Sequence, residues 1–268
     1  MLKRYLVGTD FDKTLSKEDS GIHVAELIGV DISDFEKKLD DLRVKYFLQP
    51  GAELAYLLTH DEQFKGKVTK EILKKAGKRT QLKDTTKEFF EILKNPIKGV
   101  KRGEEYLFVP YVISAAPKEI VEACLEDIIS PDNIVATEFT FDERGIVKGI
   151  KKTIAGYGKV IALDEILERE NIPKNQVIYI GDGLSDIHLM LEVRTYKGFP
   201  ISVSLSSYLS HVAHISVISA ETVAVLIPIL KNIVGYSEAR IRDFLLEKGL
   251  AIRSLQEAEV YWPAIRKI

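Results

Sequence analysis

The chain has 268 residues, of which 46% are hydrophobic and 29% charged, and its formal net charge is −2. This length fits one large domain, or a core with a smaller second domain. The near-neutral charge argues against nucleic acid as a partner, because such binders usually carry a basic excess. No apolar run approaches the roughly 18 residues of a membrane span, so no membrane is expected. Cys124 is the single cysteine, which indicates a reducing, cytoplasmic compartment.

The first part of the chain predicts one strand followed by a group of helices. Tyr5–Thr9 is short and mainly apolar, so we expect a buried strand that ends at Asp10. From about residue 16 to residue 80, no strand is predicted. Apolar residues instead recur at helical spacing in four segments: Ile22–Val30, Ile32–Leu48, Ala52–Thr59 and Thr69–Ala76. We therefore predict a small helical domain, residues 16–80, inserted after the first strand.

Downstream of this insertion, predicted strands and helices alternate. Helices are expected at Asp84–Lys94, Pro117–Ile128, Tyr157–Glu170, Asp186–Val193 and Glu221–Val234, and a loop at 95–105. Strands are expected at Leu107–Ser114, Gln176–Ile180, Phe199–Leu205 and His214–Ile218, with a hairpin formed by Ile134–Phe141 and Ile146–Ile150. Such alternation is typical of an α/β fold in which helices cover both faces of a parallel sheet. Residues 1–15 and 81–235 would form this core.

The last segment, residues 236–268, is expected to be a helical extension. It contains an amphipathic helix at about Glu238–Lys248, followed by Trp262. Two roles are open for it: packing on the core, or forming a homodimer interface through Trp262 and its neighbours.

Polar side chains follow several predicted strands at the point where each strand ends. Asp10 and Asp12 come after the first strand, Ser114 ends the second, and Asp182 follows the third. Ligands of open parallel sheets bind at the carboxyl ends of the strands. We therefore expect these four side chains to share one site.

Asp10 and Asp12 place two carboxylates close together, where they repel unless a cation neutralises them or one is protonated. Mg²⁺, a hard ion with oxygen ligands, meets the first need. A carboxylate nucleophile can split phosphate ester hydrolysis into two easier steps, and a second carboxyl can handle the proton. Taken alone, the pair also fits a turn or a helix cap.

Further residues could complete a phosphate site. Ser114 and the backbone N–H groups beside it, including that of Ala115, can hold a phosphate oxygen. Lys159 lies in the first turn of a predicted helix, where the helix dipole disfavours a cation and a bound phosphate would offset that effect. Three other basic residues compete for the same role: Lys148, Lys151 and Lys152.

Gly181-Asp182-Gly183 and Asp186 form a second acidic cluster. The glycines permit unusual backbone angles and close approach to a ligand. Asp182 is a natural metal ligand. Asp186 would orient a metal-bound water or Lys159, and the alternative is a plain helix cap.

These segments together resemble the haloacid dehalogenase superfamily. Asp10, Asp12 and Thr14 match its D-x-D-x-T motif, Ser114 its second motif, Lys159 its third, and Gly181-Asp182-Gly183 with Asp186 its fourth. The resemblance implies a Rossmann-like core, with Mg²⁺ held by Asp10, the Asp12 carbonyl and Asp182. It also implies an aspartyl-phosphate on Asp10 and proton transfer by Asp12, as in the phosphatase branch. The helical insertion is similar to the cap domain of phosphoserine phosphatases.

The chain departs from phosphoserine phosphatases near the expected substrate. Those enzymes usually carry Glu nine residues after the nucleophile, where this chain has Asp19 preceded by Glu18. Ala115 and Ala116 replace glycines, and Lys13 and Ser185 are also unusual. The substrate is therefore left open as a small phosphorylated metabolite, with Glu18 and Asp19 as candidate specificity residues. A phosphotransferase and a non-catalytic binding protein are the alternative functions.

Overall fold

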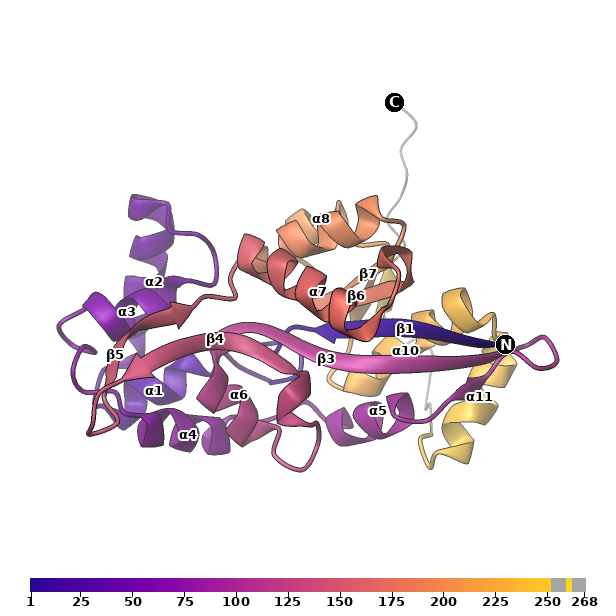
Figure 1. Cartoon of the computed structure of the whole chain (residues 1–268), viewed down its shortest axis with the longest axis horizontal. Helices are drawn as coiled ribbons and strands as arrows, with labels where there is room; N and C mark the ends of the chain where they lie inside the picture. Colours follow the sequence, from indigo (N-terminus) through magenta and orange to yellow (C-terminus); the bar gives the residue numbers. More distant parts are fainter. Residues whose placement is uncertain (252–258, 262–268) are drawn as a thin grey trace.

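The computed structural model describes residues 1–251 and 259–261, which form an α/β fold around one sheet. Its strand order is β5-β4-β3-β1-β6-β7-β8-β9, and β2 pairs with β3 (Figure 1). Six strands run parallel: β1 (Leu2–Thr9), β3 (Glu105–Pro117), β4 (Ile134–Phe141), β6 (Val177–Gly181), β7 (Phe199–Ser202) and β8 (Ile215–Ile218). Three antiparallel strands flank them: β2 (Ile97–Lys98), β5 (Val147–Lys152) and β9 (Glu259–Tyr261).

Helices cover both faces of this sheet, as predicted. Figure 1 shows α7 (Tyr157–Glu170) and α8 (Ile187–Thr195) on one face, and α5 (Thr86–Leu93), α6 (Lys118–Cys124) and α10 (Leu226–Ile229) on the other. Successive side chains of a strand point to opposite faces. On β1, Val7 accordingly packs in the larger hydrophobic core with α5 and α6, while Leu6 packs in the smaller core with α7 and α8. The predicted doubly covered parallel sheet is confirmed.

Four helices lie between β1 and α5: α1 (Gly21–Leu27), α2 (Ile32–Tyr46), α3 (Glu53–His60) and α4 (Lys70–Arg79). Their buried residues, among them Phe35 and Leu73, belong to the same large core as the sheet. Helix α4 packs closely on α6, because a Cβ at Gly77 would lie 2.3 Å from the carbonyl oxygen of Ile120. The predicted helices are present, and the division of the chain at residues 16 and 80 stays a prediction.

The chain beyond residue 235 differs from the predicted helical extension. Its helix α11 (Glu238–Glu247) buries Ile241, Phe244 and Leu245 in the larger core. Beyond it, β9 adds an antiparallel strand at the edge of the sheet beside β8, so the extension is not helical throughout. A strand of three residues is too short to leave a periodic signal in the sequence. Trp262 lies outside the described residues.

The remaining elements are short. They are η1 (Pro131–Asn133), η2 (Lys174–Gln176), η3 (Leu184–Asp186), α9 (Ser207–Ser210), η4 (Thr222–Val225) and η5 (Leu230–Val234). The helix expected at Glu221–Val234 is thus divided into η4, α10 and η5, and the loop expected at 95–105 contains β2. Within the residues the structure describes, no helix is long and apolar enough to cross a bilayer.

Candidate active site

The carboxyl ends of β1, β3 and β6 open into one cavity of about 200 Å³. Asp10 and Asp12 reach it from the loop after β1, Ser114 and Ala115 from the end of β3, and Asp182 from the loop after β6. Ala115 has no partner in the β3–β4 register, which shifts between Ser114 and Pro117. The Ser114 hydroxyl accepts a hydrogen bond from the Ala116 N–H at 3.2 Å, so its own proton is left for a ligand oxygen. The structure therefore brings together the residues predicted at the strand ends.

Lys159 lies behind this cavity and does not line it. Its side chain is completely buried in the first turn of α7. The Nζ atom is 2.9 Å from Asp10 Oδ1 and 2.6 Å from Asp186 Oδ1, and it donates to the Tyr179 hydroxyl at 3.2 Å. Burial alone would lower the pKa of Lys159, but the carboxylates of Asp10 and Asp186 raise it, so the ammonium stays charged. Its direct contacts are with carboxylates, and a phosphate contact stays a prediction.

The other lysines proposed for this role lie elsewhere. Lys151 forms an ion pair with Glu138 and Lys152 one with Glu165, both on the surface. Surface ion pairs of this kind contribute little to the free energy of folding. Of the four lysines proposed for this role, Lys159 is the one that forms an ion pair with Asp10 in the structure.

A tight turn after β6 holds Asp182 and Asp186. Asp186 Oδ2 accepts hydrogen bonds from the backbone N–H groups of Asp182 and Gly183, each at 3.1 Å. At Gly181, a Cβ would lie 2.5 Å from the Asp186 carboxyl carbon, so this turn requires glycine. The Thr14 hydroxyl donates to Asp182 Oδ1 at 3.4 Å. Asp186 thus fixes the backbone of Asp182 with one oxygen and Lys159 with the other.

Two buried carboxylates, those of Asp10 and Asp186, and the half-buried carboxylate of Asp182 make the site strongly acidic. Oxygens of Asp10, Asp182 and Asp186 all lie within 4.8 Å of one another. Burial, followed by the charge of Asp186, raises the pKa of Asp10 to about 6 although Lys159 opposes the shift. Burial, followed by the charges of Asp10 and Asp186, raises the pKa of Asp182 to about 7. Such a cluster favours either protons or a hard cation with oxygen ligands, and Mg²⁺ fits the donor set.

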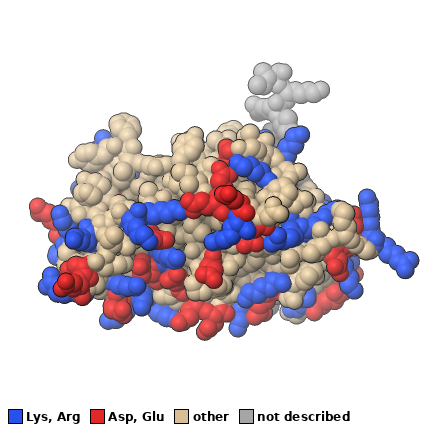
Figure 2. Space-filling model, in the orientation of Figure 1, with Lys and Arg blue, Asp and Glu red and all other residues tan. Residues whose placement is uncertain are grey.

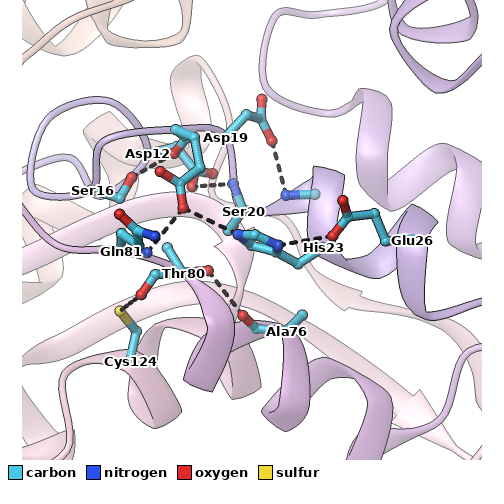
Figure 3. Close-up of polar contacts among 12 residues, drawn as sticks. Asp12, Ser16, Asp19, Ser20, His23, Glu26, Ala76, Thr80, Gln81 and Cys124 are labelled. Carbon is cyan, nitrogen blue, oxygen red and sulfur yellow. Dashed lines mark hydrogen bonds and ion pairs between the residues drawn. The ribbon is translucent and has the colours of Figure 1, made fainter. Parts of the chain in front are cut away.

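Asp12 is held by the helical insertion rather than by the sheet. Its Oδ1 accepts a hydrogen bond from the backbone N–H of Ser20 at 2.8 Å, as Figure 3 shows. Burial, followed by the charge of Asp19, raises the pKa of Asp12 well above its ordinary value. The raised pKa favours the protonated carboxyl, which is the form that donates a proton to a leaving group.

The two candidate specificity residues separate in the structure. Asp19 lines the cavity, and its Oδ1 accepts from the Gly21 N–H at 2.9 Å. Glu18 does not line the cavity, and its Oε1 accepts from the Gln81 N–H at 2.9 Å and lies 3.1 Å from His23 Nε2. Glu18 therefore ties together the two segments that connect the insertion to the sheet, and Asp19 remains the candidate for substrate contact.

The far wall of the cavity comes from α2 and α3, and the sequence did not single it out. Arg43 Nε lies 2.5 Å from Glu53 Oε1, and Glu53 Oε2 accepts from the Gly51 N–H at 2.7 Å. Glu53 is only 3% exposed although it is charged. In the sequence, Arg43 is one of many charges on an amphipathic helix, so local spacing carried no signal for it. Lys13, noted as unusual, also lines the cavity.

The chain belongs to the haloacid dehalogenase-like hydrolase family, whose model matches residues 7–191. This range contains the first motif, Ser114, Lys159 and the turn after β6. A search of curated proteins found no match.

Solved structures show where the fold recurs. A substrate-bound phosphoserine phosphatase is 21% identical, with a TM-score of 0.63, over 84% of this chain and 97% of that chain. A phosphoserine phosphohydrolase-like protein from Francisella tularensis is 20% identical, with a TM-score of 0.62, over 84% of this chain and 99% of that one. A gene product of Archaeoglobus fulgidus is 15% identical, with a TM-score of 0.65, over 97% of this chain and 90% of that one. At these identities the likeness establishes a shared fold.

Proposed function

We propose that the protein is a magnesium-dependent phosphatase that hydrolyses a small phosphate monoester through an aspartyl-phosphate on Asp10. The observation that carries this proposal is the position of Asp10. Its carboxylate lines the cavity, while its Oδ1 is held from behind by the buried ammonium of Lys159 at 2.9 Å. A nucleophile fixed in this way is preorganised for attack.

The reaction would proceed in two displacements. The Asp10 carboxylate attacks phosphorus, the bond from phosphorus to the leaving oxygen breaks, and Asp12 donates its proton to that oxygen. Asp12, now ionised, takes a proton from water as the water oxygen attacks phosphorus, and the bond from phosphorus to the Asp10 oxygen breaks. Inorganic phosphate leaves, and both carboxyl groups return to their starting states. Ser114 and the Ala115 amide would hold the phosphoryl oxygens throughout.

Asp10 and Asp182, together with the backbone carbonyl of Asp12, would hold Mg²⁺. The ion, when bound, supplies positive charge that offsets the repulsion between carboxylates and phosphate. The raised pKa values of Asp10 and Asp182 support this assignment, since they reflect a cluster short of positive charge.

The size and charge of the cavity support a small substrate. About 200 Å³ holds a phosphoryl group and a compact leaving group. Both signs of charge line the walls, with Lys13 and Arg43 opposite in sign to Asp19 and Glu53. On the face shown in Figure 2, acidic and basic residues are interleaved, which does not resemble the basic stripe typical of a nucleic-acid binder. A cytoplasmic location and a homodimer stay predictions.

Replacement of the nucleophile tests the proposal. Asp10→Asn should lower the turnover of p-nitrophenyl phosphate with Mg²⁺ by roughly a thousandfold or more, because no carboxylate remains to attack phosphorus. Asp132→Asn, at an exposed aspartate in η1, is the matched control and should keep full turnover. Unchanged turnover in Asp10→Asn would overturn the mechanism. Adding alcohols and measuring phosphorylated acceptor against free phosphate separates a hydrolase from a phosphotransferase.

A further inference from the structure

Two buried tyrosines flank a glycine in the middle of the sheet. Gly8 of β1 is paired with Tyr111 of β3 on one side and with Tyr179 of β6 on the other. A Cβ at Gly8 would lie 3.0 Å from Cδ2 of the Tyr179 ring. Both tyrosines belong to the smaller hydrophobic core. The missing side chain at Gly8 therefore makes room for the Tyr179 ring beneath the active site.

The two hydroxyl groups have different surroundings. The Tyr111 hydroxyl donates to Glu170 Oε1 at 2.6 Å, away from the cavity. The Tyr179 hydroxyl donates to Asp186 Oδ1, also at 2.6 Å, and accepts from Lys159 Nζ at 3.2 Å. An ammonium can only donate, so the Tyr179 proton must point to Asp186. Tyr179 is completely buried, and burial followed by the charge of Asp186 raises its pKa well above 10, so it keeps this proton.

The Lys159 ammonium carries three N–H groups, and three oxygens surround it. They belong to Asp10 at 2.9 Å, Asp186 at 2.6 Å and Tyr179 at 3.2 Å. Because Lys159 is completely buried, water cannot replace a lost partner without a rearrangement. The Tyr179 hydroxyl thus completes the set of contacts that sets the position of the ammonium beside Asp10.

We propose that Tyr179 is a positioning residue for the attack of Asp10 on phosphorus. Its hydroxyl fixes Lys159 and Asp186 in one arrangement, and through them the Asp10 carboxylate and the turn that carries Asp182. Tyr179 itself does not line the cavity, so it would act through Lys159 and Asp186 and not by contact with the substrate. This inference rests on the proposed phosphatase activity.

Tyr179→Phe tests the proposal, because it removes the hydroxyl and keeps the ring. With p-nitrophenyl phosphate and Mg²⁺, we expect kcat to fall about tenfold with KM within about twofold of the wild type, since an interaction that supports only the transition state is lost. The matched control is Tyr111→Phe, which removes a hydroxyl of the same core at the same 2.6 Å distance from a carboxylate. It should leave kcat unchanged.

A second variant, Gly8→Ala, should displace the Tyr179 hydroxyl without removing it. Gly8→Ala would press on the Tyr179 ring, and it should lower kcat in the wild type but add little in the Tyr179→Phe background. Non-additive effects of this kind indicate one shared pathway. Thermal unfolding of each variant checks that the loss of kcat does not follow the loss of stability.

The outcomes separate this inference from the proposed function. If the wild type is active and Tyr179→Phe is equally active, the positioning role is wrong and the proposed function stands. The same holds if Tyr111→Phe loses as much kcat as Tyr179→Phe. A rise in KM at unchanged kcat also overturns it. A wild type that hydrolyses no phosphate ester contradicts the proposed function, and the positioning role falls with it.

Discussion

At the scale of single residues, burial decides what the acidic side chains can do. Asp10 is 5% exposed and Asp186 is fully buried. Both follow the carboxyl ends of strands, where side chains are often exposed to water. The cost of burying negative charge in this cluster appears as the raised pKa values of Asp10 and Asp182. Lys159 offsets part of that cost, and a bound cation would offset more.

These pKa values predict how pH controls stability. Asp10 and Asp182 titrate near 6 and 7 in the folded chain, against an ordinary value of 3.8. Between about pH 4 and 7, the folded chain therefore binds more protons than the unfolded chain, and these groups lower the free energy of unfolding as the pH rises through that window. In EDTA, their contribution should make the protein melt at a higher temperature near pH 6 than near pH 8.

Bound Mg²⁺ should reverse this fall in stability with rising pH, because the cation takes the place of the protons on Asp10 and Asp182. The gain in melting temperature from EDTA to Mg²⁺ should grow between pH 6 and pH 8, since cation binding requires ionised carboxylates. Asp182→Asn should reduce both the gain and its pH dependence. A gain that is constant over this range, or larger at pH 6, would contradict the assignment of Mg²⁺ to these carboxylates.

Asp19 and Glu18 offer a matched pair for substrate recognition. Asp19→Asn should change KM at least about fivefold for the preferred phosphorylated metabolite, because it removes a charge from the cavity wall. Glu18→Gln, one position away and outside the cavity lining, should leave the ranking of substrates unchanged. A panel of phosphorylated metabolites measures both rankings. If Glu18→Gln alters the ranking and Asp19→Asn does not, the assignment is wrong.

At the scale of elements, the turn between α2 and α3 brings the helical insertion against the sheet. Gly51 has φ +92°, and a Cβ there would lie 3.0 Å from Cβ of both Ala115 and Ser185. Ala115 lies at the end of β3, and Ser185 lies in η3, which follows β6. The alanine at position 115, unusual for phosphoserine phosphatases, thus faces a glycine across the cavity mouth.

Gly51→Ala should therefore lower kcat/KM about tenfold, because the backbone is strained and the turn is pushed away from Ala115 and Ser185. Gly66 is the matched control within the same insertion. It has φ +76°, but no atom lies within 4 Å of the position of its Cβ. Gly66→Ala carries the same backbone strain and should keep kcat/KM. Equal losses in the two variants would assign the effect to strain and not to contact.

The sequence predicted the positions of helices and strands best where a periodic pattern of apolar residues, or a turn signal, lay within one continuous segment. The α7 range, Tyr157–Glu170, matches the prediction at both ends, and the β4–β5 hairpin lies where its turn signal indicated. Prediction was poorer where packing overrides propensity. The segment expected as one helix at Glu221–Val234 changes from 3-10 to α to π geometry, and Pro228 within it lacks a backbone N–H. β9 depends on pairing with β8, which no local pattern reveals.

At the scale of the whole molecule, the site and the C-terminal helix lie at opposite ends of β1. Figure 1 shows α11 beside the N-terminus, whereas Asp10 follows the carboxyl end of the strand. Phe244 of α11 is 7% exposed and packs in the larger core. Helix α11 therefore stabilises the fold and lies far from the candidate active site.

Phe244→Ala should accordingly lower the free energy of unfolding by about 3 kcal/mol through the cavity it leaves. Denaturant unfolding measures this loss, and kcat at a temperature well below the melting point should stay that of the wild type. Leu246→Ala, at an exposed position of the same helix, is the control and should change stability little. A fall in kcat without a fall in stability would show coupling between this helix and the site.

The sequence by itself determined which polar groups meet at the carboxyl edge of the sheet. Asp10, Asp12, Ser114 and Asp182 follow strands, and parallel strands must bring their carboxyl ends to one edge. Only the tertiary structure decided how those groups are held. It placed Arg43 and Glu53 on the far wall, separated Asp19 from Glu18, and joined Tyr179 to Lys159 and Asp186. The reason is that these contacts join residues far apart in the chain, and side-chain directions there depend on packing, which local spacing does not encode.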